Sequence, residues 1–178
     1  CYWIAGLLVY GFAAQHFAGG HLLNQTSRDI WQHLAALRAL IDNPFDPANP
    51  FVATADGSRH FHPYWVGVAA AAKALGWNEF QALALGGYLT GAALLGGIYA
   101  FARSFYRHAW GPAALLAAMV LSWSFPISHT GYHSLETLIE GLGYPAVLLV
   151  ALSLLLWALV LKSLERPRLA WLAIPLVA

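Results

Sequence analysis

The chain has 178 residues, of which 60% are hydrophobic and only 10% are charged, and its mean hydropathy is +0.59. Soluble domains carry roughly 25% charged residues, so this composition excludes an ordinary soluble domain and predicts an all-α, polytopic membrane helical bundle. The net charge of +1 offers no basic face to a phosphate backbone, which argues against nucleic acid as a partner.

The first predicted element is a membrane span at 2–17, which ends before Gly19 and Gly20. We expect it to be retained, because no cleavable signal peptide is recognisable in it. Cys1 is the single cysteine, which excludes an internal disulfide framework and a cysteine-based metal cluster. Since the chain lacks an initiator methionine and stops inside an apolar run, we expect it to be a fragment of a longer protein.

A polar loop region at 19–79 follows, and its part at 24–64 holds four of the eight acidic residues. Polar residues gathered in one loop of so apolar a chain predict a functional site there. Thr26 and Asp29 have the spacing of a helix capping box. The segment after them is too short to cross a bilayer, so we predict an amphipathic helix along the membrane surface. Its apolar stripe has helical spacing and consists of Ile30, Leu34, Leu37 and Ile41.

Asp29 and His33 are candidate catalytic residues, because a spacing of one helical turn puts them on one face. A carboxylate just after a membrane span would deprotonate an acceptor hydroxyl, and His33 would orient it or bind a phosphate. The structural alternative is that the helix dipole favours Asp29 near the helix N-terminus and that His33 is merely interfacial. Spacing alone leaves both interpretations open.

A proline-punctuated run at 43–50 is predicted to be largely extended, and a turn at Asp56 then leads to Arg59, His60 and His62. An arginine with imidazoles beside a membrane would hold the phosphate of a lipid carrier. The alternative is a solvated turn at the level of the lipid headgroups.

The segment 63–77 is ambiguous. Pro63 suits the first turn of a helix, but the segment is short for a span and carries Lys73. We therefore predict an interfacial or re-entrant helix that does not cross the membrane. The abundant tryptophans, with Trp65 among them, are predicted to form interfacial belts.

Further spans are predicted in the second half of the chain. The run at 80–101 is the clearest, and its many glycines and alanines suit close helix–helix contact. Lysine and arginine dominate the connectors at 103–107 and 162–168, which predicts that both face the cytoplasm and that the 19–79 region lies outside it. A multi-pass protein of the bacterial inner membrane fits this pattern. The remaining predicted spans are 112–125, 145–161 and the incomplete 169–178.

The second predicted extracytoplasmic loop, 128–144, is also polar. In a helix His129, His133 and Glu136 would share one side and could ligate a divalent metal, the one cofactor that these residues suggest. They do not form the HExxH zinc motif. Glu136 and Glu140 form a second acidic pair. A polar interhelical loop without a metal is the alternative.

The segment from Arg28 to His33 directly after the first span, together with the proline-bounded run at 43–50, resembles the GT-C superfamily. These are polytopic glycosyltransferases that use polyprenyl-phosphate-linked sugars. The resemblance covers essentially the whole chain, as the N-terminal part of a longer enzyme. It implies a catalytic acid in the first exported loop, which by position is Asp29, and in some members a further acidic motif where this chain has Glu136 and Glu140. The chain departs from the superfamily in having no DxD or ExD in its second loop.

The resemblance implies transfer of a sugar from a polyprenyl-phosphate donor to an extracytoplasmic acceptor. Asp29, with His33 beside it, would accept the proton of the acceptor hydroxyl. Arg59, with His60 or His62, would stabilise the charge of the departing phosphate.

Two other classes of function are compatible with parts of the sequence. A non-catalytic hydrophobic accessory or scaffold subunit of a larger membrane complex would use the polar loop to dock a partner. A transporter is disfavoured, because no charged residue lies in the middle of a predicted span. The chain also contains no P-loop, no GxGxxG, no GxSxG and no CxxC motif.

Overall fold

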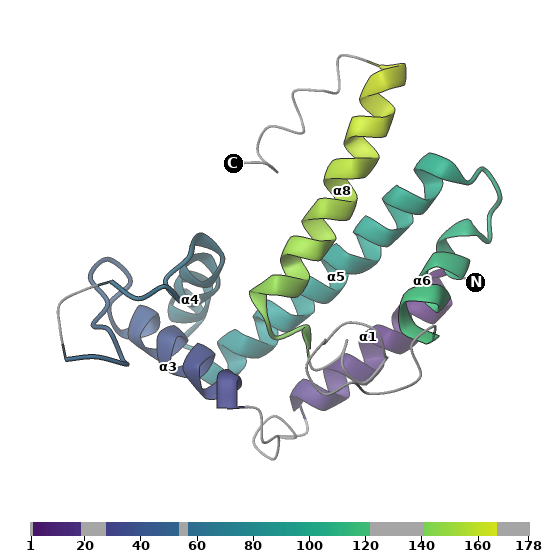
Figure 1. The fold of residues 1–178 in the computed structure, drawn as a ribbon. Helices are drawn as coiled ribbons and strands as arrows, with labels where there is room; N and C mark the ends of the chain where they lie inside the picture. The colour runs from purple at the N-terminus through teal and green to yellow at the C-terminus, as the bar shows by residue number, and fades with distance from the viewer. Residues whose placement is uncertain (1, 19–27, 54–56, 122–140, 167–178) are drawn as a thin grey trace. The chain divides into compact units, whose positions relative to one another are not determined.

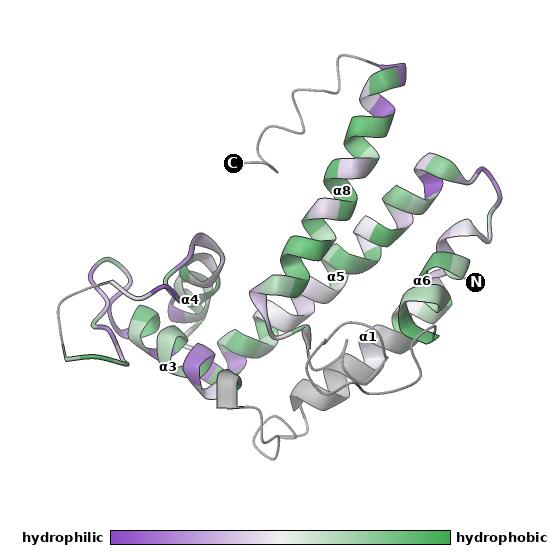
Figure 2. Ribbon diagram, viewed as in Figure 1, coloured by the Kyte–Doolittle hydropathy of each residue, from purple (hydrophilic) through white to green (hydrophobic). Residues whose placement is uncertain are grey.

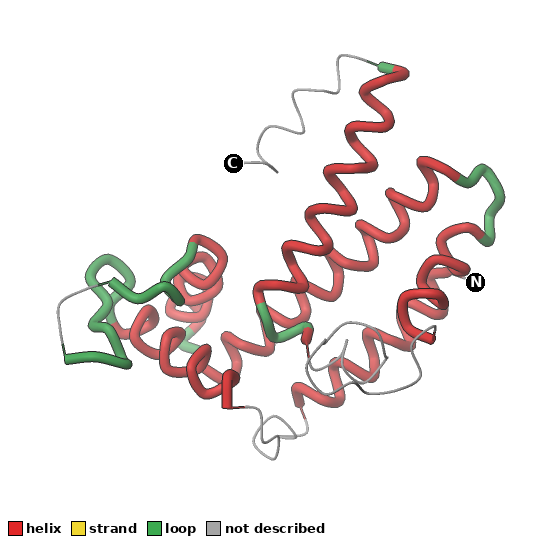
Figure 3. The backbone as a smooth tube through the Cα atoms, in the orientation of Figure 1, coloured by secondary structure: helices red, strands yellow, loops and turns green. Residues whose placement is uncertain are grey.

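The computed structural model of the chain describes residues 2–18, 28–53, 57–121 and 141–166. Within these ranges it consists of six helices and contains no strand (Figures 1 and 3). The all-α prediction is therefore confirmed for this part of the chain. The helices are α1 (Tyr2–Ala18), α3 (Arg28–Asp42), α4 (Pro63–Leu75), α5 (Glu79–Phe105), α6 (Gly111–Leu121) and α8 (Pro145–Glu165).

The chain divides into two compact units. The polar unit is Gln15–Tyr88, and it contains α3, α4 and the first part of α5. The apolar unit combines Cys1–Ala14 with Leu89–Ala178.

In the polar unit, α3 and α4 lie side by side (Figure 1). The predicted apolar stripe of α3 is largely confirmed, since Ile30, Leu34 and Leu37 are buried. Ile41 is only half-buried, and Leu40 is buried in its place. The predicted amphipathic helix therefore exists, but its apolar face is buried by the protein itself and is not left for a membrane surface. The residues proposed for its capping box precede Arg28 and lie outside the described ranges, apart from Asp29.

The ends of α4 follow from its sequence. Pro63 occupies the first turn, where its missing N–H is not needed, after the extended residue His62 (φ −104°, ψ 159°). Gly76 ends the helix in the left-handed conformation (φ 68°), and the N–H of Trp77 donates to the carbonyl oxygen of Ala72 at 2.8 Å. Its 13 residues span only about 20 Å, less than the roughly 30 Å of a bilayer core. The helix therefore stops earlier than the predicted end at 77, and its length is too short for a crossing.

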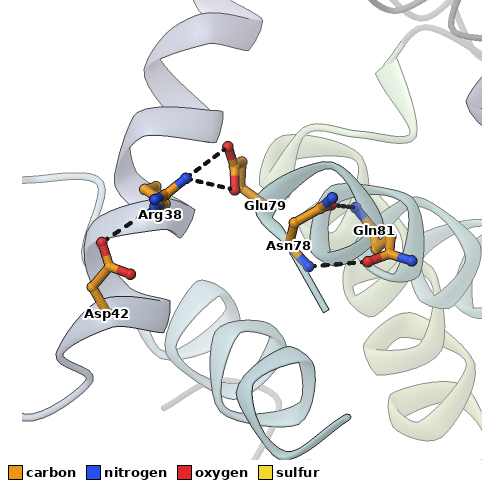
Figure 4. Close-up of polar contacts among 5 residues, drawn as sticks. All are labelled: Arg38, Asp42, Asn78, Glu79 and Gln81. Carbon is orange, nitrogen blue, oxygen red and sulfur yellow. Dashed lines mark hydrogen bonds and ion pairs between the residues drawn. The ribbon is translucent and has the colours of Figure 1, made fainter. Parts of the chain in front are cut away.

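The start of α5 is capped by two side chains. The N–H of Asn78 donates to Oε1 of Gln81 and the N–H of Gln81 donates to Oδ1 of Asn78, both at 3.0 Å (Figure 4). This reciprocal pair satisfies backbone donors that have no partner inside a helix.

An exposed ion-pair network ties α3 to this point. Arg38 lies 3.2 Å from Asp42 Oδ2 in its own helix and 3.4 Å from Glu79 Oε1 at the start of α5 (Figure 4). Lys73 of α4 donates to the carbonyl oxygen of Asp42 at 2.9 Å. The hydrogen bond with Asp42 and then the charge of Glu79 raise the pKa of Arg38. Because the pair is open to water, we expect it to set the relative position of the helices more than their stability.

Two helices of the described chain, α5 with 27 residues and α8 with 21, are long and apolar enough to cross a membrane. Hydrophobic residues run along most of α8 (Figure 2). α5 and α8 correspond to the predicted spans at 80–101 and 145–161. The predicted spans at 2–17 and 112–125 correspond to α1, with 17 residues, and α6, with 11 described residues, both shorter than a typical crossing. The segment 169–178 lies outside the described residues, so the polytopic bundle stays a prediction.

Both long helices extend beyond their predicted ends. α5 runs to Phe105, and Arg103 in its last turn donates to the carbonyl oxygens of Arg107 at 2.7 Å and His108 at 3.3 Å in the connector that follows. α8 runs to Glu165 and has Lys162 in its last turn. A basic residue near a helix C-terminus stabilises it by pairing with carbonyl groups that lack helical partners.

In the apolar unit, a glycine of α5 allows the backbones of two helices to approach closely. A Cβ on Gly97 would lie 2.7 Å from the carbonyl oxygen of Ala151 in α8. A Cβ on Gly96 would meet nothing within 4 Å. α1 contacts the same helix, since the hydroxyl of Tyr2 donates to the carbonyl oxygen of Leu95. The prediction that small residues serve helix contact is thus confirmed at Gly97 but not at Gly96.

Candidate functional site

The polar unit contains a cluster of three histidines, His33, His60 and His62, around Trp65. We call these four residues the histidine cluster. His33 comes from α3, His60 from the turn before α4, His62 from the residue that precedes α4, and Trp65 from the first turns of α4.

The cluster brings together His33 of the predicted Asp29–His33 pair and two histidines of the predicted phosphate-binding group, His60 and His62. The rings of His33 and His60 meet edge to face, with centroids 5.5 Å apart and planes at 84°. The indole Nε1 of Trp65 donates a hydrogen bond to Nδ1 of His33 at 3.3 Å. The candidate base-orienting histidine is therefore in contact with the candidate phosphate-binding segment.

His62 also lies close to the tryptophan. Its ring is parallel to that of Tyr64 with centroids 6.1 Å apart, and it lies 5.9 Å from the ring of Trp65. Burial, and then the charge of nearby His60, lower the pKa of His62. The neutral form, which has one donor and one acceptor nitrogen, is therefore favoured at this position.

The turn that carries His60 is shaped by its own residues. The N–H of Phe61 donates to the carbonyl oxygen of Ser58 at 2.9 Å, and the N–H of His60 donates to the Ser58 hydroxyl at 3.3 Å. Pro63 requires an extended residue before it, which is the conformation of His62. The ring of Phe51 lies 5.1 Å from that of His60, so the proline-punctuated segment folds back onto the cluster.

Trp65 is the centre of the cluster and has 0% of its surface exposed. A Cβ on Gly86 of α5 would lie 2.9 Å from both the indole Cζ3 and the hydroxyl of Tyr64, so only glycine leaves room for these rings. The Tyr64 hydroxyl donates to the carbonyl oxygen of Gly86 at 2.6 Å. The prediction that Trp65 belongs to an interfacial belt is therefore wrong. The neighbouring glycine in α5 was the available signal, because a missing side chain can accommodate a large ring on a facing helix.

The two charged candidates are neighbours of the cluster in the chain. Arg59 directly precedes His60 and is exposed, and its side chain makes no ion pair or hydrogen bond within the described ranges. Asp29 lies in α3, one helical turn before His33 in the chain. Nothing is described of its carboxylate, so its predicted role is not tested by the geometry.

The candidates of the second polar loop, His129, His133, Glu136 and Glu140, lie outside the described residues. Among the residues that are described, no three histidine, cysteine, aspartate or glutamate side chains come close enough to hold a metal ion.

Comparison of the chain with known protein families, with curated proteins and with solved structures finds no match. Imidazole N–H groups next to an exposed guanidinium are suited to bind an anion such as a carboxylate or a phosphate.

Proposed function

We propose that this protein is a membrane glycosyltransferase of the GT-C type, which transfers a sugar from a polyprenyl-phosphate donor to an acceptor outside the cytoplasm. The observation that supports it most is the contact between His33 and His60. It joins the helix that carries the candidate base Asp29 to the turn that carries Arg59, and the proposed reaction needs both a base and a phosphate-binding group.

The chemistry needs one bond to form and one to break. The acceptor oxygen attacks the anomeric carbon of the sugar, and the bond from that carbon to the phosphate oxygen breaks, so that the lipid phosphate leaves with the electron pair. Asp29 takes the proton of the acceptor hydroxyl, and a well-placed base accelerates such a step by roughly 10²–10⁴-fold. Arg59 and His60 stabilise the negative charge that grows on the phosphate.

The two long apolar helices support the membrane half of the proposal. α5 and α8 can each cross a bilayer by length and composition. Basic residues lie in the last turn of each, Arg103 and Lys162, which favours a cytoplasmic position for both ends. We therefore propose a polytopic protein of a bacterial inner membrane, with the polar unit on the outer side.

Substitution of Asp29 tests the proposal. We expect Asp29→Asn to abolish sugar transfer from a polyprenyl-phosphate donor in proteoliposomes, while the protein stays folded and inserted. Asp46→Asn is the matched control, because Asp46 is an exposed carboxylate of the same unit that the mechanism does not use. Full transfer activity in Asp29→Asn would contradict the proposal that Asp29 is the catalytic base of a glycosyltransferase.

A second candidate is a non-catalytic accessory subunit of a larger membrane complex. It is favoured by apolar side chains that the proline-punctuated segment leaves in the open, Phe45 at 97%, Phe51 at 43% and Val52 at 50% exposure. Stoichiometric co-purification with a complex, lost in Phe45→Ser and unaffected by Asp29→Asn, would favour this function over the enzyme.

A further inference from the structure

Trp65 constrains the chemistry of His33. An indole nitrogen always donates and never accepts a hydrogen bond. Since Nε1 of Trp65 lies 3.3 Å from Nδ1 of His33 in donor geometry, Nδ1 must be the acceptor and carries no proton. A neutral imidazole has one proton, which is then on Nε2.

We propose that Trp65 is a positioning residue that holds His33 in the tautomer protonated on Nε2, so that His33 serves the site as a hydrogen-bond donor to a phosphate oxygen. The tautomer follows from the hydrogen bond itself, whereas the identity of the ligand rests on the proposed function. His33 is thereby excluded as the base that takes the acceptor's proton, and this role is left to Asp29.

The indole is held too firmly to release His33 at little cost. Trp65 has 0% exposure, and its ring packs against Tyr64 with centroids 4.8 Å apart. The facing position in α5 is Gly86, where even a methyl group would collide with the indole. Because the indole is held by Tyr64 and by the space at Gly86, its N–H keeps a fixed direction. A fixed donor holds the imidazole ring in one orientation and one tautomer.

Titratable groups of the described residues that lie against the pair are His60, His62 and Tyr64, and Asp29 lies one helical turn before His33 in α3. His60 meets the His33 ring edge to face, and His62 lies 5.9 Å from the Trp65 ring. A proton added to any one of them disfavours a proton on the others, because like charges at this range repel. Protonation of His33 on Nδ1 would in addition break its hydrogen bond with Trp65.

The tautomer can be tested without any enzyme assay. In protein labelled with ¹⁵N at histidine and tryptophan, we expect Nδ1 of His33 to resonate as an unprotonated acceptor near neutral pH. We also expect the indole N–H signal of Trp65 to shift in step with the acid titration of His33. In Trp65→Phe, which keeps an aromatic ring but has no N–H, the Nδ1 signal should move toward a mixture of both tautomers. Trp31→Phe, at a tryptophan that is 49% exposed on the same α3, should leave it unchanged.

The donor role is tested by two substitutions of His33. Glutamine has an amide oxygen that can accept from the indole and an NH₂ group that can donate, but it cannot act as a base. We expect His33→Gln to bind a short-chain polyprenyl phosphate within a few-fold of the wild type. His33→Leu and Trp65→Phe should bind it at least about tenfold more weakly, the loss expected for one hydrogen bond to a charged group.

Each outcome decides something. A proton on Nδ1 of His33 in the wild type, or an indole signal that ignores the titration of His33, would overturn the role of Trp65 while leaving the proposed function intact. Equal losses of binding in folded His33→Gln and His33→Leu would overturn the donor role. The expected tautomer with no response of lipid-phosphate binding to any of these substitutions would overturn the donor role alone, because the proposed function is decided by sugar transfer in Asp29→Asn.

Discussion

Helices α4 and α8 begin in the same way and end up in different surroundings. Each starts with a proline after an extended residue that makes no side-chain cap, His62 (φ −104°, ψ 159°) for α4 and Tyr144 (φ −105°, ψ 138°) for α8. α4 stops after 13 residues at Gly76, and α8 continues for 21. A common start therefore says little about the role of a helix, which is decided by where it stops and by which residues it buries.

The difference in burial separates the two units. One face of α4 is fully covered, with Trp65, Ala69 and Ala72 at 0% exposure. In the most apolar 18-residue stretch of α8 only 17% is buried, against 56% in the corresponding stretch of α5. Leu149, Trp157 and Leu164 of α8 remain 58% or more exposed. The apolar face of α4 is covered within the polar unit, while α8 presents apolar residues that lipid or further helices would cover.

Of the substitutions that test this difference between the units, we expect the largest loss of stability at Trp65. We expect Trp65→Ala to destabilise the polar unit by about 3–5 kcal/mol, because it empties the centre of a closed core. Trp157→Ala in α8 should cost far less, since that side chain is 58% exposed. Denaturant unfolding in detergent, followed by hydrogen exchange of α3 and α8 amides, measures both. Equal costs at the two tryptophans would contradict the distinction between the units.

A smaller effect is expected where α5 meets α8. Gly97→Ala should destabilise the apolar unit by about 1–3 kcal/mol, because the new Cβ would lie 2.7 Å from a backbone oxygen that cannot move cheaply. Its neighbour is the control. Gly96→Ala meets nothing within 4 Å and should stabilise the helix by about 0.5–1 kcal/mol. Unfolding in mixed micelles measures the pair, and the same sign for both substitutions would count against the contact between α5 and α8.

The pH dependence of stability should come from the polar unit. Because burial lowers the pKa of His62 below its ordinary value of 6.5, the unfolded chain binds more protons than the folded chain just below that pH. Stability therefore rises with pH through this window, levels off above about 6.5, and is lost as the pH falls. We expect His62→Gln to flatten this part of the profile. His108→Gln, at an exposed histidine of the apolar unit, should leave it unchanged, and an unaltered profile in His62→Gln would contradict the burial of His62.

The smallest expected effect is at the exposed ion pair. Arg38→Gln removes the contacts with Asp42 and Glu79, and we expect a slight destabilisation that disappears at high salt, because exposed pairs are screened. Unfolding at low and high ionic strength measures it. A loss that persists in high salt would show that Arg38 contributes through packing and not through charge.

Local features of the fold were predictable from the sequence. The period of Ile30, Leu34 and Leu37 predicted α3, and Pro63 predicted the start of α4, because both signals act within a turn or two of the helix. The helix ends were less predictable. α5 continues past its predicted end, and there Arg103 bonds to carbonyl groups that follow the helix, a contact that depends on how the connector folds.

The contacts of the candidate site were harder to foresee. His33 and His60 are far apart in the chain, and their contact depends on α4 packing against α3. Trp65 was assigned to a membrane belt because tryptophans commonly occupy that position, whereas Gly86 gives it a buried place in the polar unit. Sequence spacing identifies residues that share one helix, but it carries little information about which helices meet.

The most direct test of the account is a titration of the protein in lipid nanodiscs with a short-chain polyprenyl phosphate, followed by ¹⁵N signals of the histidine side chains. The account predicts saturable shifts at His33, His60 and His62, no shift at His108, and no response to a polyprenol that lacks the phosphate. No shift in the histidine cluster, or equal shifts at His108, would contradict the claim that this cluster binds a lipid-carried phosphate.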